Sequence, residues 1–461
     1  MKRLSEKQIE YTLFHLAQHW KEDPAVTRLF VFTDAEKAIA DGHVGKIIFP
    51  LSDIQAIQEI DLTILNTTIP VLYPLSSDDE LYIIDQNGNL VFRHDYLKSA
   101  FYLLSGWQEL QTAQRDFIGR YPHTFSIQNR LRCTHLPLVN YYFEAIVQGL
   151  EAYGMYHNKA IERKRLFNEF GFLLSHDVDR VAFYHPREIL FKLKQFFGFA
   201  PRYYSKHLTL KLFFKGIAYK LNPFKKTDPW WNFEKMTEQE KRLGIRSSFY
   251  FLKKEHKNMD SRYRFSDPKI KTLIKQLISE GFEVGLHGTI HSAKHETSMM
   301  SQVRELTKTL GHKPRGIRQH YLRFFHPRTF KLQIKAGLKY DTSLAFAEHE
   351  GYRNGYSYPF KPYDFALDQM LDIWEIPLTM MEVTMLNYRK VGFDELKHSA
   401  LQLIVEARKF GGIFSLLWHN CRLDDYQYPG INSFYNSLLE SIVDLSPTSI
   451  TGRRLVEKLL D

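Results

Sequence analysis

The stretch from Gly281 to His295, GFEVGLHGTIHSAKH, decides how the second half of this chain is interpreted. Its first residues alternate apolar and polar, which is typical of a short β-strand. This strand runs directly into His287, and His291 follows four positions later. Two imidazoles at that spacing lie on one face of a helical turn and can hold one metal ion. His295 repeats the spacing, but a chain with 20 histidines produces such pairs by chance, so other residues have to support the site.

The composition limits the classes of protein to which the chain can belong. Its 461 residues are enough for two domains. Only two cysteines occur, Cys133 and Cys421, which excludes a disulfide framework and favours a reducing compartment. The first twenty residues lack the apolar core of a signal peptide, and no run of about eighteen apolar residues occurs. We therefore expect a cytoplasmic protein with no membrane-spanning helix.

The region up to about residue 165 is predicted to be a smaller mixed α/β domain. Helices are expected at 6–20, 96–109 and 138–153, and strands at 29–32, 46–50, 71–73, 81–84 and 90–92. The last two strands flank an Asp-Gln-Asn-Gly-Asn turn, which indicates a hairpin. The polar residues of this region are dispersed, so we interpret residues 1–165 as an accessory domain of unknown function.

From residue 166 to 461 the pattern predicts a different architecture. Strands are expected at 171–174, 245–252, 282–286, 316–318, 340–343, 373–377 and 413–417, with helices between them. Strands that alternate with helices form parallel βαβ units. About seven such units predict a distorted (β/α) barrel, in which the chemistry lies at the carboxyl ends of the strands.

Polar side chains follow most of these strands at the point where each strand ends. They are Asp177 and Asp179, His287 and His291, Arg318 with His320 and Tyr321, Asp341, and His419. Convergence of two carboxylates, several histidines and an arginine on one cleft is far less probable by chance than any single motif. The sequence therefore predicts one catalytic site at this edge of the barrel.

The order and spacing of these motifs resemble the NodB-homology polysaccharide deacetylases, carbohydrate esterase family 4. SHDVD at 175–179, GFEVGLHGTIH at 281–291 and Leu-Trp-His at 417–419 match well, whereas RQHY at 318–321 and YDTS at 340–343 match loosely. The resemblance spans residues 167–440. Two departures stand out: Ser175-His176 replaces the usual Thr-Phe, and His320 takes the place of a proline. The N-terminal region is similar to the accessory domain that precedes such modules in some bacterial proteins.

The resemblance implies a metal-dependent hydrolase that removes N-acetyl or other N-acyl groups from an amino sugar in a polysaccharide or glycan precursor. Asp179, His287 and His291 would bind one divalent ion, with zinc the expected metal. Asp177 would be the general base, poised by Arg318. His419 would be the general acid, with Asp341 as its orienting partner, and Tyr321 and Trp418 would contact the oxyanion or substrate.

Two alternatives stay open at this point. Hydrolysis of a non-glycan cyclic amide on the same fold would use the same groups. A non-catalytic carbohydrate-binding module would need neither Asp177 nor His419, so the presence of both residues counts against it.

A basic, aromatic insertion is expected at about residues 185–228. Between Arg187 and Lys226 it carries ten Lys or Arg and one acid, interleaved with Phe and Tyr, in a chain of net charge +10. Solvated helices are the simplest interpretation, and contact with the inner face of a membrane is the next. Nucleic-acid binding is not expected, because no nucleic-acid motif accompanies the charge.

Overall fold

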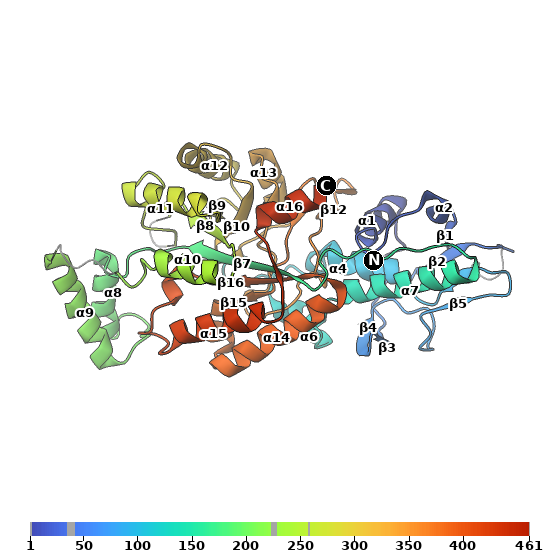
Figure 1. The fold of residues 1–461 in the computed structure, drawn as a ribbon, viewed down its shortest axis with the longest axis horizontal. Coiled ribbons are helices and arrows are strands. Elements are labelled where there is room, and N and C mark those ends of the chain that lie inside the picture. The colour runs from blue at the N-terminus through green and yellow to red at the C-terminus, as the bar shows by residue number, and fades with distance from the viewer. Residues whose placement is uncertain (1, 35–41, 223–227, 257–258, 461) are drawn as a thin grey trace.

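The computed structural model describes residues 2–34, 42–222, 228–256 and 259–460. The molecule is elongated, with the N-terminal region at one end and helices α8 (Pro186–Phe196) and α9 (Lys206–Leu221) at the other (Figure 1). Residues 223–227 of the expected insertion lie outside the described residues.

The N-terminal region is built on a small four-stranded sheet with the order β1-β2-β6-β5. Strands β1, β2 and β6 are parallel, and β5 pairs with β6 as the antiparallel hairpin that the Asn-Gly turn predicts. Its elements are α1 (Glu6–Leu16), α2 (Pro24–Thr27), β1 (Phe30–Asp34), β2 (Ile47–Leu51), β3 (Ile60–Ile64), β4 (Thr67–Val71), β5 (Tyr82–Ile84), β6 (Leu90–Phe92), α4 (Tyr96–Leu104), α5 (Trp107–Leu110), η1 (His123–Phe125), α6 (Ile127–Arg130) and α7 (Leu138–Tyr156).

The region from residue 171 onward is built on a second sheet whose strands are all parallel. Its order is β14-β11-β10-β9-β8-β7-β16-β15, with β17 added beside β7. These strands are β7 (Gly171–Val178), β8 (Ser248–Leu252), β9 (Glu283–Gly288), β10 (Gly316–Gln319), β11 (Tyr340–Asp341), β14 (Trp374–Glu375), β15 (Met380–Met381), β16 (Ile413–Leu417) and β17 (Thr448–Ser449). The sheet thus has nine named strands rather than about seven, because β15 and β17 join those expected.

The two ends of this sheet are brought together by one extended segment. Residue Trp374 in β14 pairs with β11 at one end of the order, and Met380 in β15 pairs with β16 at the other. Only four residues separate β14 from β15, so the sheet must curl and bring its two ends near each other. The result is a mixed α/β fold with a curled parallel sheet of the barrel type.

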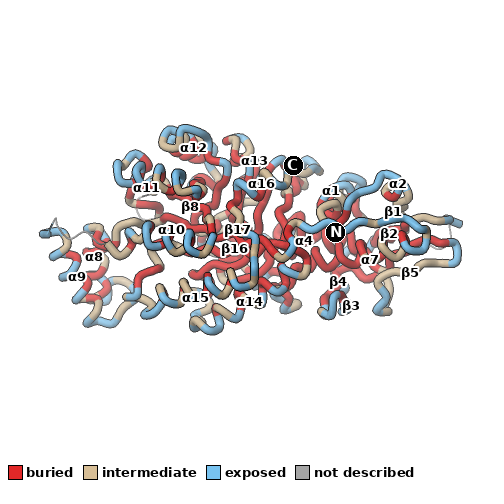
Figure 2. Tube along the Cα trace, viewed as in Figure 1, coloured by how far each residue is buried: buried red, intermediate tan, exposed pale blue. Residues whose placement is uncertain are grey.

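Helices cover the outside of the curled sheet (Figure 1). They are α10 (Phe233–Arg242), α11 (Pro268–Ser279), α12 (Glu296–Leu310), α13 (Arg328–Ala336), α14 (Phe393–Phe410), α15 (Ile431–Val443) and α16 (Gly452–Leu460), with short turns η2 (His320–Leu322), η3 (Thr384–Arg389) and η4 (Asn420–Arg422) and a small hairpin of β12 (Tyr363–Asp364) and β13 (Gln369–Met370). Every residue of β7, β8 and β16 is buried, as parallel strands covered on both faces should be (Figure 2).

The N-terminal region packs on the curled sheet through a shared core. One hydrophobic cluster contains residues of α1, α4 and α7 together with Phe324, Tyr356 and Phe410 of the second region. Backbone contacts reinforce it: the amide of Val139 donates to the carbonyl of Gly355 at 2.7 Å. The division into domains at about residue 165 therefore stays a prediction, although the sheets on either side of it are separate.

Candidate metal centre

The register of the parallel strands sets the position of each side chain in the centre. His287 in β9 stands opposite Arg318 in β10, and Asp177 near the end of β7 stands opposite Tyr250 in β8. Because all these strands run the same way, the residues at their carboxyl ends meet at one edge. The expected location of the site follows from this alignment.

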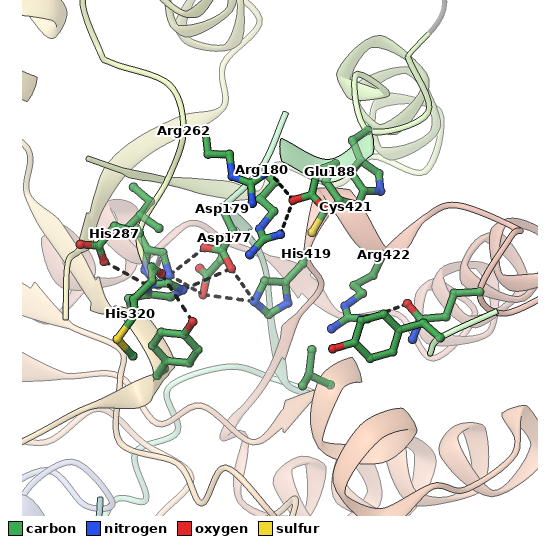
Figure 3. A pocket seen from close by; sticks show the side chains of 18 of the residues that line it. Asp177, Asp179, Arg180, Glu188, Arg262, His287, His320, His419, Cys421 and Arg422 are labelled. Carbon is green, nitrogen blue, oxygen red and sulfur yellow. Dashed lines mark hydrogen bonds and ion pairs between the residues drawn. The ribbon is translucent and has the colours of Figure 1, made fainter. Parts of the chain in front are cut away.

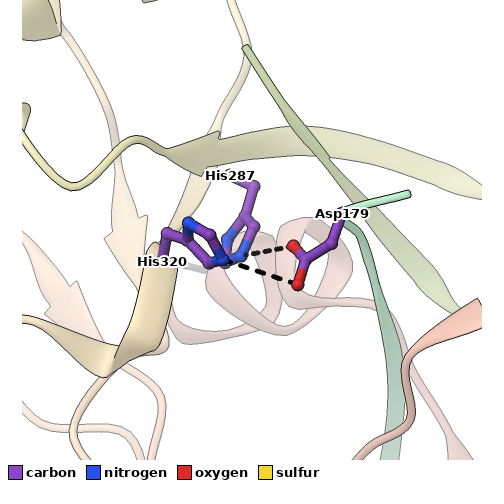
Figure 4. Close-up of side chains that lie close together, drawn as sticks. All are labelled: Asp179, His287 and His320. Carbon is purple, nitrogen blue, oxygen red and sulfur yellow. Dashed lines mark ion pairs between the residues drawn. The ribbon is translucent and has the colours of Figure 1, made fainter. Parts of the chain in front are cut away.

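Three side chains converge at this edge: Asp179, His287 and His320 (Figure 4). The Nε2 atom of His287 lies 3.3 Å from Oδ1 of Asp179, and Nε2 of His320 lies 3.5 Å from Oδ2 of the same carboxylate. Their candidate ligand atoms all lie within 4.8 Å of one another. Burial raises the pKa of Asp179, but the two imidazoles outweigh burial and hold that pKa well below its usual value.

The donor atoms of this group fit a divalent cation. Asp179 Oδ1 and His287 Nε2 are both buried and neither forms a hydrogen bond. The second ring nitrogen of His287, Nδ1, lies 2.8 Å from the carbonyl oxygen of Arg318, to which it can donate its proton and so leave the lone pair on Nε2. His320 likewise turns Nδ1 toward Oδ1 of Asp260, at 3.4 Å. Metal-bound histidines are typically oriented by such acceptors, and one carboxylate with two imidazoles suits zinc and its neighbours.

The structure does not bring His291 to this group. His291 is exposed, and its nearest ring neighbours are His256 at 5.7 Å and His295 at 6.1 Å between centroids. Strand β9 continues to Gly288, so His287 belongs to a strand and His291 lies in the turn beyond it, and the two do not share one helical face. His320, which the sequence places at the end of its strand without an assigned role, takes the third position.

A tight turn after β10 carries His320. Tyr321 and Leu322 both have positive φ, 61° and 54°, a conformation that is uncommon for residues other than glycine and that clusters at functional sites. The ring of Tyr321 stacks on His320 with centroids 3.9 Å apart. The N-terminal region supports the turn, because Arg120 donates from Nη1 to the Tyr321 carbonyl at 3.0 Å.

Asp177 lies beside the group and is held by a buried arginine. Its Oδ1 accepts from Nη1 of Arg318 at 3.0 Å, and its Oδ2 lies 3.5 Å from Nε2 of His287. Arg318 is fully buried and also donates to Ser175 and Thr342. The guanidinium thus orients Asp177 from behind and does not line the cavity.

His419 faces the group from the opposite side, where a carboxylate that the sequence analysis missed orients it. Its Nδ1 lies 2.7 Å from Oε1 of Glu382, and its Nε2 lies 3.8 Å from Oδ2 of Asp179. Burial lowers the pKa of the His419 imidazole, but Glu382 and the two aspartates outweigh burial and raise it to about 9. Glu382 directly follows β15. Functional side chains were expected directly after strands, so a strand predicted at 380–381 would have pointed to Glu382.

Two expected residues have other roles in this structure. Asp341 accepts hydrogen bonds from Gln333 and Ser343 and makes no contact with His419. Trp418 is fully buried against Tyr435 and lies in the core, so its side chain does not face the site. Both residues lie at strand ends. Successive side chains of a strand point to opposite faces of the sheet, and these two point away from the site.

The group lies in a cavity of about 500 Å³ (Figure 3). Asp177, Asp179, His287, Tyr321 and His419 line it, together with His320. Its walls combine aromatic side chains with cationic ones, among them Tyr204, Trp230, Arg262 and Arg422. Such a mixture suits a polar ligand with ring faces.

Comparison with known proteins yields one family match and several distant structures. A family model described as a family of unknown function, DUF7033, matches residues 3–154. No curated protein matches the chain.

Three solved structures illustrate the structural likeness. A protein assigned as a polysaccharide deacetylase from Pseudomonas aeruginosa PAO1 shares 12% identity at a TM-score of 0.42, over 66% of this chain and 96% of its own. Puue allantoinase shares 12% identity at a TM-score of 0.41, over 63% of this chain and 90% of its own. A protein assigned as a polysaccharide deacetylase from Mycobacterium smegmatis shares 14% identity at a TM-score of 0.40, over 63% of this chain and 89% of its own. All three TM-scores lie below 0.5, so these likenesses support no assignment of function to the site.

Proposed function

We propose that this chain is a metal-dependent hydrolase that removes an N-acyl group, acetyl in the first instance, from an amino sugar in a glycan or glycan precursor. The observation that carries the proposal is the set of Asp179, His287 and His320, in which Asp179 Oδ1 and His287 Nε2 are buried and form no hydrogen bond. The choice of an amino sugar follows from the SHDVD and GFEVGLHGTIH motifs and their resemblance to the deacetylases.

One divalent ion, with zinc as the first candidate, would be held by these three residues. When bound, it would polarise the acyl carbonyl and lower the pKa of a water molecule. His320 replaces His291 in the ligand set that the sequence predicts. Its ring is fixed from one side by Asp260 and from the other by the stacked ring of Tyr321.

Asp177 is the proposed general base. It lies within the cavity next to the ligands, and Arg318 keeps one of its oxygens occupied, so the second oxygen is directed toward the reacting atoms. His419 is the proposed general acid, which donates a proton to the leaving amine from the opposite wall. Glu382 holds Nδ1 of His419 and leaves Nε2 to face the cavity.

The decisive experiment measures metal content and acetate release on the same preparations. We expect one divalent ion per chain and release of acetate from an N-acetylated amino sugar or its oligomers. Asp179→Asn should lose both metal and activity, whereas Asp177→Asn should keep the metal and lose activity. Full acetate release by Asp177→Asn, or activity on a cyclic ureide with none on acetylated sugars, would contradict the proposal.

A further inference from the structure

The helical hairpin of α8 and α9 exposes an unusual number of large apolar side chains. Within residues 190–221 the exposed ones are Leu190, Phe197, Phe199, Tyr203, Phe214, Ile217 and Leu221. Phe199 is 82% exposed and Leu221 is 79% exposed. Single exposed apolar side chains are common on protein surfaces, but a cluster of them on one element marks a contact surface.

Helix α9 has two apolar faces, of which only one is covered. Leu212 and Gly216 are buried, and an added Cβ at Gly216 would lie 2.7 Å from Ile189 of α8, so this face packs on its neighbour. Phe214, Ile217 and Leu221 recur at helical spacing on a second, exposed stripe. Figure 2 shows exposed residues along the outer side of this end of the molecule.

Lysines flank the exposed stripe on both sides. At 100° per residue, Lys211 and Lys215 fall on one side of Phe214 and Ile217, and Lys206 and Lys220 fall on the other. Among the described residues, Lys206, Lys211 and Lys220 form no ion pair with a carboxylate. Lysines in this position can extend their amines past an apolar surface toward anionic groups.

The charge of the hairpin surface is entirely positive. The exposed charged residues between 187 and 222 are Arg187, Lys194, Arg202, Lys206, Lys211, Lys215 and Lys220. The one carboxylate in this span, Glu188, is buried and pairs with Arg180 and Arg262. A partner for this surface must therefore be anionic at its surface and apolar beneath it.

We propose that the α8–α9 hairpin is a docking surface for a membrane that contains anionic lipids. The exposed aromatic and aliphatic side chains would enter the boundary between headgroups and acyl chains, and the flanking cations would contact the headgroups. No described helix is long and apolar enough to cross a bilayer, so the contact is peripheral. Binding of this surface to a membrane does not require the hydrolytic chemistry proposed above.

The hairpin is also one wall of the cavity. Phe191, Lys192 and Gln195 of α8, with Tyr203 of the connecting segment, line the space that contains His287 and His419. Docking of the hairpin therefore brings the cavity wall close to the lipid headgroups. A substrate held at a membrane surface would need no further carrier to reach the site.

The test is flotation of the full-length protein with vesicles of two compositions. We expect binding to phosphatidylcholine vesicles that contain phosphatidylglycerol, and little binding to phosphatidylcholine alone. The triple variant Lys206→Gln, Lys211→Gln, Lys220→Gln should bind at least about tenfold more weakly, because each surface cation contributes to the attraction. The triple variant Phe214→Ser, Ile217→Ser, Leu221→Ser should lose binding as well.

Matched variants on other surfaces serve as controls. Lys269→Gln, Lys271→Gln, Lys275→Gln removes three exposed charges from α11, and Met155→Ser, Val405→Ser, Leu460→Ser removes three exposed apolar side chains elsewhere. Both should bind like the unmodified protein. Hydrolysis of a soluble substrate should be unchanged in every variant, which separates this proposal from the catalytic one. The absence of binding to anionic vesicles, binding that is equal for both compositions, or binding to RNA alone would overturn it.

Discussion

Arg318 contacts both a proposed metal ligand, His287, and the proposed general base, Asp177. Its carbonyl accepts from Nδ1 of His287, and its guanidinium donates to Asp177. One residue thus sets the tautomer of a proposed metal ligand and the orientation of the proposed base. A buried arginine of this kind is costly to desolvate, and its hydrogen bonds to Ser175, Asp177 and Thr342 offset that cost.

The two candidate third ligands can be separated by one pair of substitutions. His320→Gln should lower metal affinity by at least about tenfold, since it removes one of three ligands. His291→Gln should leave metal content unchanged, because His291 is exposed and outside the group. Metal titration against a chromophoric chelator measures both. The reverse result would restore the ligand set expected from the sequence.

The role of Glu382 can be tested apart from metal binding. Glu382→Gln should lower kcat by about ten- to a hundredfold, because His419 loses the carboxylate that orients it. Metal content should stay the same, since Glu382 contacts none of the three ligands. Asp341→Asn is the matched control and should keep kcat, as Asp341 contacts Gln333 and Ser343 instead. Equal losses in the two variants would argue against an orienting role.

At the scale of elements, β10 is the strand on which the centre depends most. It carries Arg318, leads into His320 and pairs with β9 and β11 on either side. Gly316 at its start allows close approach of Tyr340, because an added Cβ would lie 1.9 Å from Cζ of that ring. Tyr340 cannot easily move, since its hydroxyl donates to Glu283 and lies 3.0 Å from that of Tyr250.

Gly316→Ala should therefore lower the free energy of unfolding by about 1–3 kcal/mol, the usual cost of overpacking a core. It should also reduce metal affinity, because β10 carries the turn with His320. Gly392→Ala provides the control, since nothing lies within 4 Å of its added Cβ and its φ is negative. Urea unfolding and metal titration of both variants give the comparison. Wild-type stability in Gly316→Ala would show that the strand can shift at little cost.

At the scale of the whole molecule, the N-terminal region is part of the site's construction. Arg120 is nearly buried, paired with Asp116 at 2.6 Å, and reaches the Tyr321 carbonyl and the Tyr388 hydroxyl. It also lines the cavity. The region that matches a family of unknown function thus supports the turn that presents His320.

Loss of this support should weaken metal binding without unfolding the chain. Arg120→Gln is expected to lower metal affinity by about tenfold, the effect typical of outer partners of a metal site. Arg130→Gln is the control, because Arg130 makes an exposed ion pair with Glu59 and neither residue lines the cavity. If both variants bind metal equally well, Arg120 has no positioning role.

Two buried histidines make the junction of the regions sensitive to acid. Burial lowers the pKa of both His15 and His19 to about 3. Nε2 of His15 accepts from the backbone amide of Lys361, and His19 contacts the Tyr356 hydroxyl. Below the unfolded pKa of about 6.5 the unfolded chain binds protons that the folded chain does not, so stability is complete above that pH and falls toward pH 3.

We expect each histidine to lower the free energy of unfolding by about 1–2 kcal/mol when the pH falls from 7 to 5. In the double variant His15→Gln, His19→Gln, the fall in stability over this range should be correspondingly smaller. Urea unfolding at the two pH values measures the difference. The control is His398→Gln, since His398 is exposed. If the free energy of unfolding of the double variant fell as much between pH 7 and pH 5 as that of the unmodified protein, the neutral, buried state of these rings would be contradicted.

Local patterning was sufficient to predict several parts of the fold. The expected strands at 282–286 and 413–417 and the Asn-Gly hairpin follow from apolar alternation and turn chemistry, which act over a few residues. Asp177, Asp179, His287 and His419 could be assigned to one edge because the carboxyl ends of parallel strands meet there. None of these inferences required knowledge of how distant segments pack.

Tertiary packing decided the remaining features of the centre. The choice between His291 and His320 depends on where β9 ends and on the strained turn at Tyr321, which Arg120 supports from about two hundred residues earlier in the chain. Glu382 reaches His419 only because the 374–381 segment links the two ends of the curled sheet. Such contacts join residues far apart in sequence, and no local pattern encodes their distance. The sequence alone therefore determined which chemical groups stand at the strand ends, and the curled sheet determined which of them meet.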